Sequence, residues 1–84
     1  MRPTTMQLRH LAREVSTALE LALVRMAPSP LIENLASVAG LLTALEALPL
    51  DTESLRVWAE EANERAERVL AEWKPWEEQH RVTA

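Results

Sequence analysis

Apolar residues recur at spacings of three and four along three successive segments of this chain, which is the pattern of amphipathic helices. We expect helices at about 5–26, 30–48 and 52–74, followed by a tail at 75–84. The connections are about four residues or fewer, so consecutive helices should lie antiparallel in an up-down-up three-helix bundle. The predicted fold class is all-α, with the whole chain, 1–84, forming a single helical domain.

Capping residues define the expected ends of these helices. Either Thr4 or Thr5 can cap the first helix, and either Asp51 or Thr52 can cap the third. Ser29 lies between two prolines and is expected to cap the second helix, with the second proline in the first helical turn. All three helices therefore have a start signal in the sequence.

Each helix has an apolar stripe that predicts its buried face. The stripes comprise Leu8, Leu11, Val15, Ala18, Leu19, Ala22 and Met26 in the first helix, Leu31, Leu35, Val38, Leu42 and Leu45 in the second, and Leu55, Ala59, Ala62, Ala66, Val69, Leu70 and Trp73 in the third. Pro75 lacks a backbone N–H and should break or kink the third helix near Lys74. The tail would then be a short extra turn or a mobile end.

The second helix differs from the others because its segment, 31–50, contains only Glu33 and Glu46 as charged residues. A helix with so little polar surface needs cover on most sides, and two neighbours do not provide enough. A second copy would supply that cover, and we expect a homodimer through this helix. Small residues on its reverse face either let another backbone approach closely or serve only as good helix formers. These candidate interface residues are Ala36, Gly40, Ala44 and Ala47.

Four larger side chains are further candidates for contact with a partner. Leu21 and Val24 project from the otherwise polar side of the first helix, near its end. Trp58 lies at the edge of the third stripe and Trp76 follows the proline. Tryptophan is enriched at binding hot spots but also fills cores, so both tryptophans can instead cap the bundle end.

The net charge of −4 is unevenly spread. Residues 1–42 hold four Arg and three Glu, giving +1, while residues 43–84 hold five basic and ten acidic side chains, giving −5. This balance disfavours nucleic acid and anionic membranes and favours a basic protein partner. The local exception is a basic group, Arg2, Arg9, His10 and Arg13, which the sequence also allows to be scattered surface charge. The negative charge is concentrated in the third helix, in an acidic rim that comprises Glu60, Glu61, Glu64 and Glu67.

Candidate chemistry is sparse. The absence of cysteine excludes thiolate mechanisms, and a single glycine excludes a glycine-rich phosphate loop. His10 and Glu14 have the spacing of a metal half-site, but a hydrogen-bonded or solvated pair is the simpler interpretation. Glu77 and His80 match one Glu-x-x-His motif, which only a symmetric dimer could complete into a carboxylate metal site. We therefore expect no enzymatic activity and no cofactor.

The sequence favours a small helical protein–protein interaction module, such as an adaptor, chaperone or assembly factor, that self-associates through its apolar central helix. The alternative is an acidic inhibitor (an antitoxin, immunity or anti-defence protein) that neutralises a basic effector through the acidic rim. The dimer-completed metal site is a third hypothesis. Residues 1–6 lack the apolar run of a secretory signal, so we expect a cytoplasmic protein.

Overall fold

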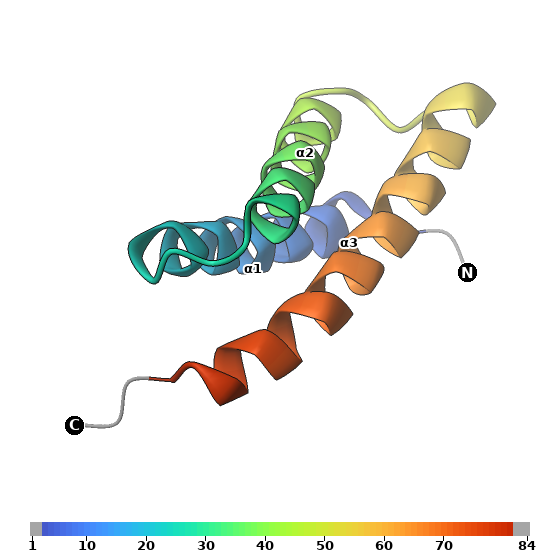
Figure 1. Ribbon diagram of the computed structural model, residues 1–84. Helices are drawn as coiled ribbons and strands as arrows, with labels where there is room; N and C mark the ends of the chain where they lie inside the picture. Colours follow the sequence, from blue (N-terminus) through green and yellow to red (C-terminus); the bar gives the residue numbers. More distant parts are fainter. Residues whose placement is uncertain (1–2, 82–84) are drawn as a thin grey trace.

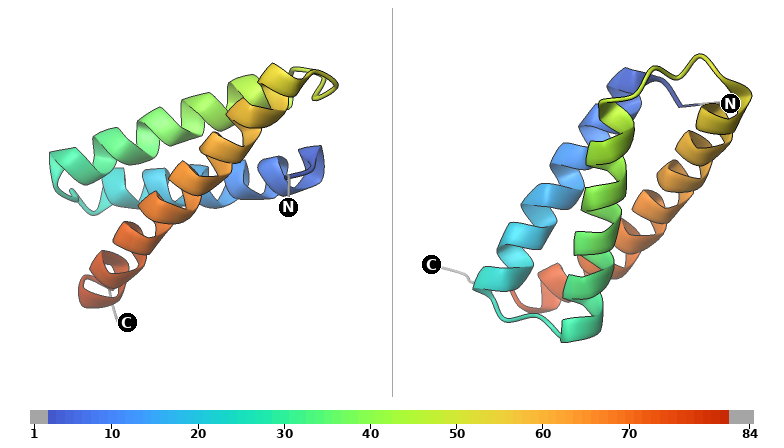
Figure 2. Two further views of the ribbon diagram at one scale, coloured as in Figure 1. Left: turned by 90° about the vertical axis from the view of Figure 1, so that its right-hand side faces the viewer. Right: turned by 90° about the horizontal axis from the view of Figure 1, so that it is seen from above.

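The computed structural model describes residues 3–81, which fold into three helices around a single apolar core (Figure 1). The helices are α1 (Thr5–Val24), α2 (Ser29–Glu46) and α3 (Glu53–Gln79), and no strand occurs in the described range. Figure 2 shows α1 and α2 lying side by side while α3 crosses them obliquely. The predicted all-helical class with three helices is confirmed. The end of the predicted tail, 82–84, lies outside the described residues.

Threonine side chains cap α1 and α3, as predicted. Thr4 Oγ1 accepts a hydrogen bond from the backbone N–H of Gln7 at 3.1 Å, and the Gln7 side chain accepts one from the N–H of Thr4 at 2.7 Å. Thr52 caps α3 by accepting from the backbone N–H three residues later at 3.3 Å. The predicted cap of α2 was wrong: Pro28 is the N-cap and Ser29 is already helical, because the carbonyl of Pro28 accepts the first helical hydrogen bonds.

α1 ends at Val24, slightly before the predicted end, in a Schellman motif. The N–H of Ala27 donates to the carbonyl of Ala22 at 2.9 Å, and the N–H of Met26 donates to the carbonyl of Leu23 at 3.3 Å. Met26 takes a left-handed φ of 56° in this turn. Its side chain is 86% exposed, so its predicted place in the core stripe was wrong.

Replacing Met26 by glycine should stabilise the fold. A left-handed φ costs a residue with a Cβ about 1 kcal/mol or more, whereas glycine adopts it freely. We expect Met26→Gly to raise the free energy of unfolding in urea by about 0.5–1 kcal/mol, after allowance for the greater freedom of glycine in the unfolded chain. Met6→Gly is the matched control, because Met6 is also exposed but lies within α1, where glycine is unfavourable. A loss of stability in both variants would contradict the left-handed turn.

The core is entirely apolar, since no polar or charged residue of the described range is buried. The predicted stripes of α2 and α3 are buried, apart from Leu55, which is half-buried. In α1 the buried face is rotated relative to the prediction: Ala12 occupies a core position, whereas Leu11 and Leu19 are half-buried. The buried residues are Leu8, Ala12, Val15, Ala18, Ala22, Ala27, Leu31, Leu35, Val38, Leu42, Leu45, Ala59, Ala62, Ala66, Val69, Leu70 and Trp73.

α3 continues through Pro75 to Gln79, so the break predicted at this proline was wrong. Proline removes one intrahelical hydrogen bond and crowds the carbonyl one turn earlier. Contacts beyond the proline compensate for this loss. The indole of Trp76 stacks on that of Trp73 with ring centroids 5.5 Å apart, and the imidazole of His80 stacks on Trp76 with centroids 4.2 Å apart. The last turn of α3 is thus held by the aromatic side chains around it.

Candidate functional site

The outward face of α2 carries the small residues that the sequence marked as interface candidates. Ala36, Gly40, Ala44 and Ala47, the small-residue face, are all exposed, and a Cβ added at Gly40 would meet nothing within 4 Å. The large aliphatic side chains of α2 instead pack toward α1 and α3: five are buried in the shared core, and Ile32 and Leu41 are half-buried against it. The two flanking helices therefore cover more of α2 than the sequence led us to expect. What remains open is the small-residue face.

Large apolar side chains are exposed at the end of α1 and at the start of α3. These two helix ends lie at opposite ends of the molecule (Figure 2). Leu23, Val24 and Met26 form one group at the end of α1, and Val57 and Trp58 form another at the start of α3. The sequence marked Val24 and Trp58, which are 79% and 58% exposed. It missed Leu23, because helical spacing places that residue at the border of the buried stripe.

A groove of about 410 Å³ runs between α1 and α3, the pair of helices that share the least contact. Leu21, one of the sequence candidates, lines it from α1 and is half-buried. Leu70 and Trp73 line it from α3 and belong to the core, as predicted for both. The groove therefore has an apolar floor. Its polar rim consists of His10, Arg13, Glu14, Thr17, Lys74 and Glu77.

Both candidate metal motifs are engaged in other contacts. His10 Nε2 lies 2.7 Å from Glu14 Oε1 on the exposed surface of α1. Glu77 Oε2 lies 3.8 Å from Arg25 Nη1, an ion pair that joins the ends of α1 and α3. His80 Nδ1 lies 2.9 Å from the carbonyl oxygen of Trp76 rather than beside Glu77. In the described part of the chain no group of three or more His, Asp or Glu side chains could hold a metal ion.

The acidic rim lies along α3, and all of its carboxylates are exposed except that of Glu60, which is half-buried. Glu61 and Glu64 each precede an arginine by four residues, a spacing that favours ion pairs on helices. Neither pair lies within ion-pair distance in the structure as described. Arg65 instead donates to Ser37 Oγ on α2 at 3.1 Å. The rim is consequently left with a net negative charge facing solvent.

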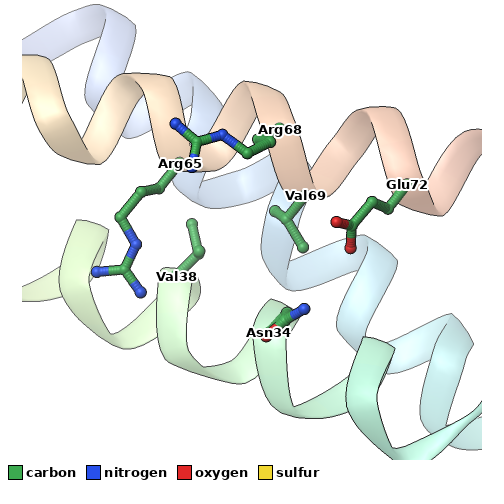
Figure 3. Close-up of a pocket in the computed structure, with 6 residues that line it drawn as sticks. All are labelled: Asn34, Val38, Arg65, Arg68, Val69 and Glu72. Carbon is green, nitrogen blue, oxygen red and sulfur yellow. The ribbon is translucent and has the colours of Figure 1, made fainter.

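A second pocket, of about 260 Å³, lies between α2 and α3 (Figure 3). Two guanidinium groups, one amide and one carboxylate surround its two valines, so it can form hydrogen bonds to a polar group. Sequence patterns did not predict it, because its polar residues belong to the solvated sides of two separate helices. The lining residues are Asn34, Val38, Arg65, Arg68, Val69 and Glu72.

The basic group at the start of α1 is partly neutralised by α2. Arg9 Nε donates to Glu46 Oε1 at 3.1 Å, and both side chains remain partly accessible to solvent. Arg2, another member of this group, lies outside the described residues. Arg13 is exposed and lines the groove between α1 and α3.

Two surfaces therefore stand out as candidate docking sites, the small-residue face of α2 and the groove between α1 and α3. Within residues 3–81, no helix is long and apolar enough to cross a membrane. Comparison with protein-family models, with curated protein sequences and with solved structures finds no match to this chain.

Proposed function

We propose that this chain is a non-enzymatic helical protein–protein interaction module, an antiparallel up-down-up bundle that forms a homodimer through the small-residue face of α2. In the cytoplasm it binds a further protein partner as an adaptor, chaperone or assembly factor. The observation that carries the proposal is the near absence of charge on this face. α2 contains two charged residues, of which Glu46 is paired with Arg9 and only Glu33 is exposed.

The desolvation cost distinguishes this face from the rest of the surface. Ala36, Gly40, Ala44 and Ala47 carry no charge, so burying them leaves Glu33, one turn before Ala36, as the charge that has to stay at the solvated rim. Desolvating an unpaired charge is expensive. The outward sides of α1 and α3 carry Arg13, Glu20 and the acidic rim, so burying them would incur that cost. Small side chains also let two helix axes approach closely, which increases the contact per residue.

The area of the face limits how stable the dimer can be. α2 has 18 residues and is therefore about 27 Å long. Multiplied by the diameter of about 11 Å of a helix with its side chains, this gives about 300 Å² per subunit, or about 600 Å² in total. That total lies in the range of weak, transient interfaces. We therefore expect a dimer in equilibrium with folded monomer rather than an obligate one.

Ala44→Glu tests the dimer. Glutamate is a good helix former and position 44 is exposed, so the monomer should stay folded while a charge enters the interface. We expect the dimer dissociation constant, measured by sedimentation equilibrium, to rise at least about tenfold. Ala71→Glu is the matched control, because it makes the same substitution at an exposed position of α3 and should leave the constant nearly unchanged.

Two results would overturn the proposed dimer. The first is a monomeric mass for the unaltered protein over about a hundredfold range of concentration. The second is an equal effect of Ala44→Glu and Ala71→Glu, which would place self-association on another surface or attribute it to net charge. Circular dichroism of both variants verifies that the helices are intact.

A second candidate function is the acidic inhibitor, and the unpaired carboxylates of Glu61 and Glu64 favour it. A basic effector would be held mainly by charge, so its binding should weaken as salt rises and should fail in the double variant Glu61→Gln, Glu64→Gln. Binding that is insensitive to salt and lost in Leu21→Asp would instead favour contact through an apolar surface. The two hypotheses therefore predict opposite responses to salt.

A further inference from the structure

The groove between α1 and α3 continues along most of the length of α1. The hollow of about 410 Å³ that contains Leu21 and Trp73 is called the lower groove. A second hollow, lined by Met6 and Leu11 of α1 and by Asn63 of α3, adjoins it. His10 lines both hollows, so they adjoin one another along α1. The distance along α1 from the first to the last of these residues corresponds to about 22 Å, the length of a helix of about 15 residues.

The two charged side chains of the lower groove that have no partner among the described residues are both positive and lie on opposite banks. Arg13 projects from α1 and Lys74 from α3, and neither has an ion-pair partner within the described range. The two carboxylates that line the same hollow have partners: Glu14 lies 2.7 Å from His10, which adds a positive charge only when protonated, and Glu77 lies 3.8 Å from the guanidinium of Arg25, just beyond α1. An occupant of this hollow therefore meets an apolar floor between two available cations.

We propose that this groove binds an amphipathic helix of a protein partner whose apolar face is flanked by carboxylates. The apolar side chains of that helix lie along Met6, Leu11 and Leu21, and its acidic residues pair with Arg13 and Lys74. Laying a helix into an apolar groove is a recurrent mode of recognition, and flanking charges fix its orientation and register. This inference rests on the proposed role as an interaction module and names the class of partner.

The local charge of the groove reverses the expectation drawn from the whole chain. A net charge of −4 favours a basic partner at long range. Contact distances are shorter than the screening length, however, so the side chains that line the groove determine which flank is accepted. Glu78, one turn beyond Lys74, is not within ion-pair distance of it and leaves the ammonium group available. Acidic flanks are therefore preferred at this site.

Two synthetic helical peptides of about 15 residues test the proposal, because they can share one leucine face and differ only in flanking Glu or Lys residues. Binding is followed by the three tryptophan indole N–H signals in NMR spectra of the full chain. We expect the Glu peptide to shift the Trp73 signal while leaving the exposed Trp58 unaffected. The Lys peptide should bind at least about tenfold more weakly.

Arg13→Gln and Arg68→Gln provide the matched pair of variants, since both arginines are exposed and only Arg13 lines this groove. Arg13→Gln should weaken binding of the Glu peptide about threefold to tenfold, and Arg68→Gln should leave the affinity for this peptide unchanged. Equal binding of the two peptides, absence of binding, or equal effects of the two variants would overturn the proposal. If dodecanoate shifts the Trp73 signal and the Glu peptide does not, the groove binds a lipid-like amphiphile. That result would also overturn the proposal.

The peptide experiment is independent of the dimer experiment. Sedimentation of Ala44→Glu reports on α2, whereas the indole signals report on the opposite pair of helices. If the protein is monomeric and binds the Glu peptide, the homodimer is contradicted and the groove is supported. If the protein is a dimer and binds neither peptide, self-association is supported and the groove is contradicted.

Discussion

Leu42→Ala is expected to lower the free energy of unfolding by about 3 kcal/mol. Leu42 is fully buried in α2, so its truncation removes apolar burial and leaves a cavity between rigid helices. A single core in a chain of this size seldom supplies more than about 3–5 kcal/mol, so most of the stability should be lost. Urea denaturation followed by far-ultraviolet circular dichroism measures the effect, as a lower midpoint with an unchanged slope.

Leu48→Ala is the matched control for this prediction. It makes the same substitution just beyond the end of α2, where the side chain is 42% exposed. A partly solvated leucine contributes less burial and leaves no closed cavity, so we expect a loss below about 1 kcal/mol. Comparable losses in the two variants would contradict the assignment of α2 into an inward apolar side and an outward small-residue face.

The elements of this fold were largely predictable because their signals are local. Thr4 and Thr52 cap α1 and α3 by hydrogen bonds to backbone groups three residues away, which depend on almost nothing else in the chain. The inward faces of α2 and α3 were also predicted. α2 contains large aliphatic residues at regular helical spacing, and the buried apolar residues of α3, half of them alanines, are separated from the charged residues that cover its other sides. Neither helix has an alternative face that would bury its apolar residues equally well.

The core face of α1 was predicted only in part, because the helix offers two choices that differ by a small rotation. Leu11 and Ala12 are adjacent, and hydrophobicity favours the leucine. The structure buries Ala12 and leaves Leu11 half-buried, and α1 and α2 share the most extensive contact of the three helix pairs. A small residue at a helix contact permits closer axes. Periodicity along one helix carries no information about how near its neighbour lies.

The candidate site shows the same division between local and tertiary information. The exposure of Val24 and Trp58 agrees with their positions, outside the apolar stripe for Val24 and at its edge for Trp58. The groove that contains Leu21 did not follow, because it depends on the angle at which α3 crosses α1. The availability of Arg13 and Lys74 likewise depends on which carboxylates have other partners in three dimensions.

Pro75→Ala is expected to raise the free energy of unfolding by about 2–2.5 kcal/mol. Proline in a helix interior costs about 3 kcal/mol, because it removes a hydrogen bond and crowds the preceding turn. Alanine restores the N–H that can donate to the carbonyl of Ala71. Part of the gain is offset, since proline also restricts the unfolded chain by the equivalent of about 0.5–1 kcal/mol. The side chain of Pro75 is exposed, so its removal sacrifices little burial.

Pro49→Ala separates these two contributions of proline. Pro49 lies in the exposed connection between α2 and α3, where alanine regains no helical hydrogen bond. The substitution therefore only gives the unfolded chain more freedom, and stability should fall slightly. Opposite signs for the two variants in urea denaturation are therefore expected, with slower amide exchange at Trp76 in Pro75→Ala. If both variants lose stability, α3 does not run through position 75 in solution. The stacking of His80 on Trp76 would then have to hold a separate turn, because it could no longer extend the helix.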